Sequence, residues 1–335
     1  MAGSAAGGLA NRAPGLPAGR GLRLLAECAN PACASGWLQL WRRRSVPVFE
    51  AGWCCSPGCM RARVEAALRR ESEARGAALE RHRHRMPLGL AMLEQGWITA
   101  ADLRRALGAQ RAAGTGRLGQ WLVQGRATTE AMVTRALGLQ WNCPVLSVDL
   151  GGPEALTAAL PRLFVDAFGA LPLRVAAGKI LYLGFEDRLD PALALALERM
   201  LGLRVESGLV AESRFRPAQQ RMLEARFPPV ELIEAASLAV LARVLTRAIE
   251  RAHAAEARLV RLHDFFWLRL WRSEPAGGLA EPDQVSDLIC TLAASGSGDL
   301  ASDSSNLLAA PAVRLLHGFF AFEGVDRWTA ATTRR

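Results

Sequence analysis

Residues 87–110 read PLGLAMLEQGWITAADLRRALGAQ, and residues 117–140 read RLGQWLVQGRATTEAMVTRALGLQ. At this offset of 30 residues, nine of the 24 aligned positions are identical. Self-similarity at a fixed spacing is typical of a duplicated structural unit. Each copy predicts a short helix, a break near Gly96 or Gly125, and a second helix. We expect two equivalent units side by side, which would present a surface with pseudo-twofold symmetry.

The second helix of the first copy has its own start signal. Thr99 stands where an N-cap residue belongs, and Asp102 follows three residues later as part of a capping box. Leu103, Leu107 and Gln110 then recur at i, i+4 and i+7, which places them on one helix face. A glycine early in each copy lets another segment approach the backbone closely.

The pattern changes after the repeat and predicts a small α/β unit. Short apolar runs are separated by turn residues, and a proline at residue 191 is typical of the first turn of a helix. The expected elements are strands at 144–148 and 203–210, a hairpin of 171–175 and 180–185, and helices at 153–160, 190–200 and 212–227.

The repeat and the segments after it resemble a known family. The family pattern begins with RLG, continues with two apolar residues and a later glycine, and closes with Leu, Leu and Gln, and here it occurs in tandem. Four segments follow the repeat in order: LQWNCPVLSVDL, FGALPLRV, ILYLGFEDRLDP and MLGLRVESGLV. This order is similar to the N-terminal domain of type II secretion and type IV pilus assembly ATPases, the GspE N-terminal or MshEN-like domain, over residues 86–226. The resemblance implies docking on secretion or pilus machinery or on another regulatory protein, and some members bind cyclic di-GMP.

The resemblance also implies a set of ligand-facing residues in the two copies. An arginine suits phosphate charge and guanine edges, while backbone donors and apolar side chains suit the rest of a cyclic dinucleotide. The candidates are Leu88, Gly89, Met92, Leu93, Gly96 and Gln110 in the first copy, and Arg117, Leu118, Gly119, Leu122, Val123 and Gln140 in the second.

Two positions depart from the family pattern. The first copy has Pro87 where the family has arginine, and the second has Arg126 where the family has glycine. Loss of a charge-assisted arginine contact costs about 1.5–3 kcal/mol. We therefore predict a non-catalytic regulatory or adaptor protein that docks on a partner. The alternative is a cyclic di-GMP receptor that binds through both copies.

Five of the seven cysteines lie between residues 28 and 59. Cys28 and Cys33 form one close pair, and Cys55 and Cys59 form a second, with 21 residues between the pairs. Two such pairs suit the four sites of tetrahedral Zn(II). We expect a structural zinc ion, with Cys54 as an alternative to Cys55 and free buried or redox cysteines as the other interpretation.

Charge is concentrated at the start of the chain. Residues 1–85 hold 14 arginines against six glutamates, which accounts for most of the net charge of +9. This segment could bind nucleic acid through its basic zinc unit, or it could be a solvated arginine-rich face. We expect a flexible leader at 1–20, a cysteine-rich unit at 21–62, a basic, exposed linker helix at 63–85, and a mostly helical region at 227–335. Within this last region we expect helices at 231–257 and 307–320 and two short strands within 259–271.

The predicted fold class is α+β: a zinc-binding unit, a tandem helical repeat with a small α/β domain, and a helical C-terminal region. The sequence contains no GxxxxGK[ST] phosphate-binding loop and no recognisable catalytic constellation, so we expect no enzyme. It also has no apolar run of about 18 residues and no Leu-rich signal segment, which favours a cytoplasmic location.

Overall fold

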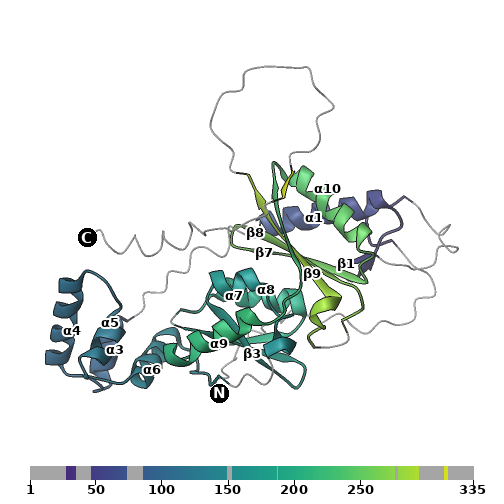
Figure 1. Cartoon of the computed structure of the whole chain (residues 1–335). Helices are drawn as coiled ribbons and strands as arrows, with labels where there is room; N and C mark the ends of the chain where they lie inside the picture. Colours follow the sequence, from purple (N-terminus) through teal and green to yellow (C-terminus); the bar gives the residue numbers. More distant parts are fainter. Residues whose placement is uncertain are drawn as a thin grey trace, which may run out of the picture.

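The computed structural model describes residues 28–34, 47–73, 86–148, 153–186, 188–275 and 278–293, together with the backbone of 313–315. Helices and strands gather around three hydrophobic cores, and the predicted α+β class is confirmed (Figure 1). The leader expected at 1–20 lies outside the described residues. Within them, no helix is both long enough and apolar enough to span a membrane.

The tandem repeat forms two helix pairs, as the duplication predicts. The first pair is α3 (Leu88–Glu94) and α4 (Ala100–Ala113), and the second is α5 (Leu118–Gln124) and α6 (Glu130–Trp141). Thr99 caps α4 through a complete capping box with Asp102. The four helices enclose a small core of their own and lie together at one end of the molecule (Figure 1).

The α/β unit after the repeat also follows the prediction. Its sheet has the order β3 (Ala170–Ala176), β4 (Ile180–Phe185) and β5 (Arg204–Leu209), with β4 antiparallel to β3 and parallel to β5. The helical segments are η2 (Pro153–Leu156), α7 (Arg162–Ala167), α8 (Pro191–Leu201) and α9 (Glu212–Glu224). The strand expected at 144–148 is reduced to a single parallel bridge between Val145 and Leu209.

The prediction of a mostly helical region at 227–335 is wrong, because strands dominate its described part. The elements are β6 (Val230–Ala235), α10 (Leu238–Arg251), β7 (Glu256–Leu262), β8 (Phe265–Trp271), η3 (Pro282–Gln284), β9 (Val285–Leu292) and β10 (Val313–Leu315). They form a five-stranded sheet in the order β10-β6-β9-β8-β7. The final helix expected at 307–320 is likewise contradicted at 313–315, where the backbone pairs with β6.

The single helix expected across 231–257 divides into strand, helix and strand. In β6 the buried residues Ile233 and Ala235 alternate with less buried ones, which is the period of a strand. Ser237 then caps α10, since its hydroxyl accepts a hydrogen bond from the Val240 N–H at 3.3 Å. At this cap, the spacing of buried positions along the chain changes from two residues, as in a strand, to 3.6 residues, as in a helix.

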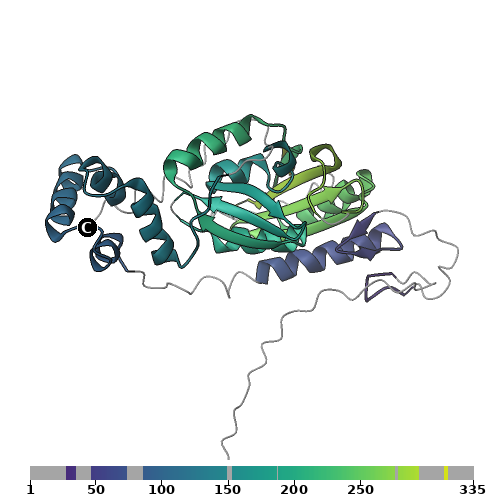
Figure 2. The ribbon, with the colours of Figure 1, turned by 90° about the horizontal axis from the view of Figure 1, so that it is seen from below.

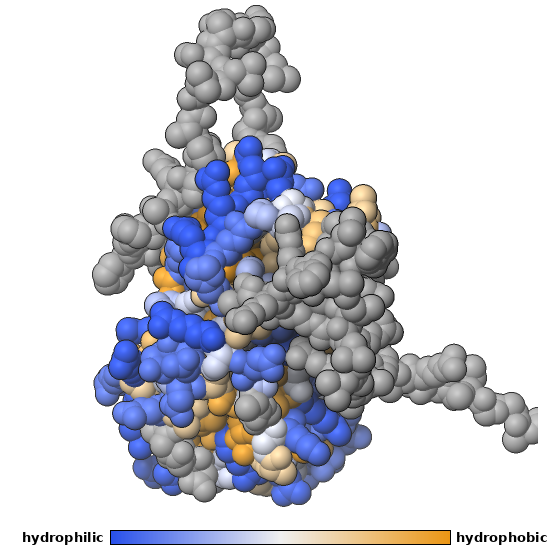
Figure 3. Space-filling view, turned by 90° about the vertical axis from the view of Figure 1, so that its right-hand side faces the viewer, coloured by the Kyte–Doolittle hydropathy of each residue, from blue (hydrophilic) through white to orange (hydrophobic). Residues whose placement is uncertain are grey.

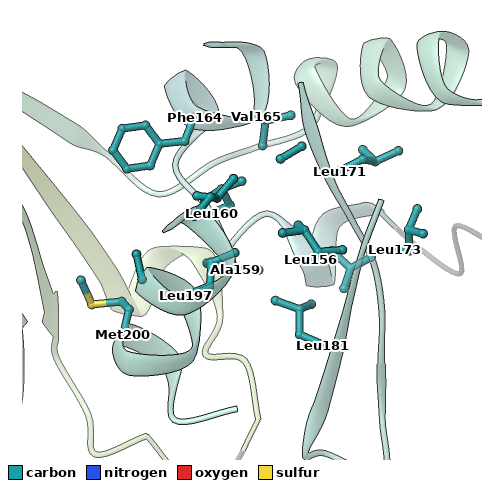
Figure 4. Packing of buried hydrophobic residues seen from close by; sticks show 14 of the residues in the cluster. Leu156, Ala159, Leu160, Phe164, Val165, Leu171, Leu173, Leu181, Leu197 and Met200 are labelled. Carbon is teal, nitrogen blue, oxygen red and sulfur yellow. The ribbon is translucent and has the colours of Figure 1, made fainter. Parts of the chain in front are cut away.

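The five-stranded sheet is covered on both faces, so its strands are apolar on both sides. Trp267 and Trp271 of β8 join the core that contains the α/β unit, whereas Phe266 and Leu268 face the core beneath α10. Figure 4 shows part of the first core, where residues of η2 and α7 pack toward β3, β4 and α8. The C-terminal sheet and the α/β unit therefore share one hydrophobic core.

The N-terminal part contributes β1 (Val48–Phe49), β2 (Gly52–Trp53) and α1 (Pro57–Glu73). The basic helix expected over 63–85 was predicted to be exposed, but Val64, Ala67 and Leu68 of α1 are buried against α10 and the sheet. Residues 74–85 lie outside the described part. Figure 2 shows α1, in purple, lying along the strands of the sheet, with the repeat at the far end.

Polar residues occupy the outer surfaces of α1 and α10. Arg243, Arg247 and Arg251 of α10 are exposed, as are Arg61 and Arg69 of α1. Figure 3 shows this side of the molecule, where hydrophilic residues cover much of the described surface and apolar residues form separate patches. Both helices are amphipathic, and each buries its apolar face.

Candidate metal centre and tandem repeat

The structure brings Cys28, Cys33, Cys55 and Cys59 together, and their Sγ atoms all lie within 4.8 Å of one another. The Sγ of Cys55 is 3.5 Å from that of Cys33 and 3.6 Å from that of Cys59. A zinc ion with Zn–S bonds of about 2.3 Å would hold its four sulfurs about 3.8 Å apart. The separations fit a tetrahedral metal site, so these four cysteines could hold a metal ion.

Local hydrogen bonds fix the two halves of this cluster. The Ser56 hydroxyl accepts from the Cys59 N–H at 3.2 Å, and α1 begins at Pro57, which places Cys59 in its first turn. The Ala29 N–H donates to the Trp53 carbonyl at 2.8 Å, which joins the first cysteine loop to β2. The cluster therefore connects three segments: the loop, the hairpin and the helix.

Arg63 braces the same region from α1. Its guanidinium donates to the Ala29 carbonyl at 3.0 Å and to the Phe49 carbonyl at 3.4 Å. Gly52 lies close against this loop, since an added Cβ would be 2.5 Å from the Ala29 Cβ. A side chain at residue 52 would push the first cysteine loop away from β2.

The two candidates for the third ligand differ in their position. Cys55 lies in the four-sulfur cluster, whereas Cys54 packs in the core beneath α10. Burial raises the pKa of the Cys54 thiol to about 11, as expected for a small apolar core residue. Burial also raises the pKa of the Cys28 thiol to about 12.

The repeat has the pseudo-twofold packing expected from the duplication. A Cβ added at Gly89 would lie 2.6 Å from Leu103 and 3.3 Å from Leu118. At the equivalent Gly119, it would lie 2.7 Å from Val133 and 3.7 Å from Leu88. Each glycine therefore receives the second helix of its own copy and the first leucine of the other copy.

The two glutamines make a second reciprocal contact. The Gln110 amide donates to the Gly116 carbonyl at 2.8 Å, immediately before the second copy begins. The Gln140 amide donates to the Met86 carbonyl at 2.6 Å, immediately before the first copy begins. Each copy thus uses its last residue to fix the start of the other, a contact that the glutamine identity alone did not reveal.

The break between the helices survives the change from Gly96 to Arg126. Both residues have left-handed backbone, with φ of 68° and 55°, respectively. The Gly96 N–H donates to the Leu93 carbonyl, and the Arg126 N–H donates to the equivalent Val123 carbonyl. Arg126 does not block the break, but a non-glycine residue in this conformation is strained by about 1–2 kcal/mol.

The residues predicted to face a cyclic dinucleotide differ in how exposed they are. Met92 and Leu122 are fully buried in the repeat core, so a ligand could reach them only if the helices separated. Gly96 and Arg117 are exposed, and the other candidates are buried glycines or partly buried side chains. The Arg117 guanidinium lies 3.4 Å from the Glu186 carboxylate, which joins the repeat to the α/β unit.

Exposed apolar side chains concentrate on the repeat and its exit. Six large apolar residues are exposed among the described residues, and Met86, Leu90, Leu139 and Val145 belong to this part of the chain. Leu139 and Val145 line one shallow groove on the outer face of α6. The other residues lining this groove are Ala131, Arg135, Gly138 and Cys143.

No family model and no curated protein matches the chain. Among solved structures, one of MshE with cdg shares 25% identity and a TM-score of 0.32, and the alignment covers 41% of this chain and 99% of that chain. Two crystal forms of the XpsE N-terminal domain share 23% identity, with TM-scores of 0.30 and 0.22. They cover 40% of this chain and 92% and 93% of those chains.

Proposed function

We propose that this chain is a non-catalytic cytoplasmic adaptor or regulator, related to the N-terminal domain of type II secretion and type IV pilus ATPases. It docks on a partner protein of that machinery through the tandem repeat. The observation that carries the proposal is the set of exposed apolar side chains on the repeat and its exit, two of which, Leu139 and Val145, line the groove. Exposed apolar surface of this kind marks protein interaction sites.

The rigidity of the repeat supports a docking role. The reciprocal glycine and glutamine contacts hold the two copies in one arrangement. The segment that lines the groove after α6 is held by hydrogen bonds from the Cys143 N–H to the Gly138 carbonyl at 2.9 Å and from the Leu146 N–H to the Leu209 carbonyl at 2.7 Å, so the groove is already formed before a partner binds. A preorganised surface loses less conformational entropy on binding than a mobile one. The Leu139 side chain is 55% exposed in the free chain, so a partner that covers it would bury additional apolar surface.

A matched pair of variants tests this proposal. Leu139→Gln removes an apolar contact from the groove, and Leu195→Gln makes the same change on α8, where the leucine is 57% exposed. Purified cytoplasmic components of secretion and pilus machinery, including the assembly ATPases, are the probes in biolayer interferometry. We expect Leu139→Gln to weaken binding about tenfold or more and Leu195→Gln to leave it unchanged. Equal effects, or no binding component, would contradict the proposal.

A cyclic di-GMP receptor is the second candidate function. The two copies exchange equivalent contacts about a pseudo-twofold axis, which suits a ligand that is itself twofold symmetric. Arg117 would supply the cationic contact of the second copy. Calorimetric titration should give micromolar or tighter binding that is lost in Arg117→Ala. An absence of heat and of a thermal shift at millimolar ligand would leave the repeat as a docking scaffold.

We further propose that Cys28, Cys33, Cys55 and Cys59 bind a structural zinc ion. The support is four sulfurs at near-tetrahedral spacing with no histidine or carboxylate among the ligands. Elemental analysis should give one zinc per chain. Cys55→Ser should abolish this stoichiometry, whereas Cys143→Ser should not. Full zinc retention in Cys55→Ser would sink the assignment.

Nucleic-acid binding by residues 1–85 remains a prediction with less support. In α1, Arg63 is engaged by backbone carbonyls, Arg70 by Glu50 and Arg61 by Glu65. Binding through phosphates would weaken steeply with salt. Fluorescence anisotropy with duplex DNA and RNA at two salt concentrations would decide it, and binding that is absent even at low salt would remove this alternative.

A further inference from the structure

The outer edge of β7 is covered by the N-terminal segment. β7 is the last strand at one side of the five-stranded sheet, where backbone groups would otherwise lack strand partners. The Val48 N–H donates to the Ala254 carbonyl at 3.0 Å, and the Glu50 N–H donates to the Ala257 carbonyl at 2.8 Å. Phe49 between them is fully buried in the core beneath α10. β1, which pairs as a strand with β2, therefore covers this end of β7 through two backbone hydrogen bonds.

The other end of β7 is covered by the carboxylate of Glu71 in α1. This carboxylate accepts from the Arg261 N–H at 3.2 Å. Burial alone would raise the pKa of Glu71, but ion pairs with Arg199 and Arg70 hold it below its usual value. Glu71 is therefore a buried anion with two cationic partners. Because α1 carries Glu71, the part of β7 that this residue covers stays covered without help from the cysteines.

Both α1 and the β1–β2 hairpin have anchors besides the cysteines, but the hairpin has fewer: the buried Phe49, the Glu50–Arg70 ion pair, and a hydrogen bond from the Ala51 N–H to Glu256 at 3.0 Å. α1 has its own apolar anchors, including Val64 and Leu68. The β1–β2 hairpin has strands of only two residues, which are too short to be stable alone. Its C-terminal end is followed by the buried Cys54 and then by Cys55 of the cluster, and β2 is joined to the loop of Cys28 through the Ala29–Trp53 hydrogen bond.

We propose that the metal centre acts as a clasp whose occupancy decides whether β1 covers the edge of β7. This inference rests on the proposed metal centre. With metal bound, the hairpin is fixed between the cysteine loop and α1; without it, the hairpin leaves residues 254–257 open while α1 stays in place. The opened edge fits an extended chain segment that carries one large apolar side chain, because β1 itself presents Phe49 there.

Hydrogen exchange with mass spectrometry on the full chain tests the clasp. Chelation should accelerate exchange of the amides in residues 48–53 more than about tenfold, because local opening sets their protection. Residues 64–71 of α1 and 265–271 of β8 should keep their protection. Unchanged exchange in the hairpin, or loss of protection throughout the chain, would overturn the clasp. A purified protein that contains no metal would instead refute the metal centre itself.

Matched variants and a peptide probe test separately whether the cysteines hold the hairpin and whether the opened edge of β7 binds an extended segment. Cys55→Ser should show the fast hairpin exchange without chelator, while Cys143→Ser, which lies outside the cysteine cluster, should keep the slow hairpin exchange of the metal-loaded chain. A peptide of residues 45–53, SVPVFEAGW, should bind the chelated protein at least about tenfold more tightly than the metal-loaded one. The same peptide carrying Phe49→Gln should lose this preference. Equal binding to both forms of the protein would exclude a metal-controlled edge.

Discussion

Replacement of Asp287 should destabilise the chain more than a surface change would, because the residue belongs to a buried ion pair. Its carboxylate accepts from Arg269 Nε at 2.7 Å and from Arg269 Nη2 at 2.8 Å, and both side chains have no exposed surface. The Trp267 indole donates to the same carboxylate at 2.7 Å. Asp287→Asn keeps the shape of the side chain but leaves the guanidinium without a counter-charge.

The expected cost of Asp287→Asn is about 3–5 kcal/mol, as measured for other buried pairs that lose one partner. This is a large fraction of the roughly 5–15 kcal/mol that holds a domain folded. The double variant Arg269→Met with Asp287→Leu should recover much of the loss, because no buried charge remains. Recovery should stay incomplete by about 1–3 kcal/mol, since the carbonyls of Ala158 and Ala159 would lose their donor.

Urea unfolding followed by tryptophan fluorescence measures both changes, and Trp267 reports from the network itself. The pair joins β8 and β9 to the segment before α7, so the sheet and the α/β unit should unfold in one transition. A loss below about 1 kcal/mol for Asp287→Asn would refute the reasoning. A double variant no more stable than Asp287→Asn alone would also refute it.

Three further predictions concern the repeat and a surface pair. Gly119→Ala should cost about 1–3 kcal/mol in thermal unfolding, because its methyl would lie 2.7 Å from stiff Val133, and Val133→Ala in the same chain should relieve it. Arg126→Gly should raise stability by about 0.5–1 kcal/mol, since strain at φ 55° exceeds the added chain entropy; lower stability would contradict this. The hydrogen bond to Asp190 raises the pKa of His263 in the folded chain. The pair therefore stabilises the folded state fully below pH 6.5, and this stabilisation is lost as the pH rises through the folded-state pKa. The stability difference between the unaltered chain and His263→Gln should therefore shrink from pH 6 to pH 9, and a constant difference would exclude the pair as its cause.

The helices of the repeat were predictable because each sequence feature that marks a helix start or a break occurs twice, once in each copy. Thr99 and Thr129 both cap a second helix, and the break recurs at the same offset. The break at Arg126 shows that the hydrogen-bond pattern, rather than the glycine, defines the turn. The reciprocal roles of Gln110 and Gln140 were not predictable, because they depend on how the two copies pack.

The cysteine cluster was predictable as a set, but the choice between Cys54 and Cys55 was not. Adjacent residues after a strand point to different sides, and only the packing of the hairpin on the sheet shows which side faces the cluster. In the C-terminal sheet, the two strands within 259–271 were predicted and are β7 and β8, whereas β9 was missed because it is buried on both faces. Such strands lose the alternation that distinguishes a strand from a buried helix.

The burial of α1 had a signal in the sequence that charge obscured. Met60, Val64, Ala67 and Leu68 recur at i, i+4, i+7 and i+8, which is the apolar stripe of a packed helix. The arginines on the opposite face made the segment resemble an exposed linker. The stripe needed a partner, and α10, about 180 residues later, could not be identified as that partner from local sequence.

The separation of the cores limits how the parts of this protein can influence one another. The N-terminal helix, the C-terminal sheet and the α/β unit share packed surfaces, whereas the repeat has a small core of its own. The repeat reaches the rest of the chain through the Val145–Leu209 bridge and contacts such as Glu130 with the Ser213 N–H at 2.7 Å. A partner or nucleotide on the repeat would therefore act on the sheet through α6 and its exit, whereas metal at the cysteine cluster would act on the sheet directly.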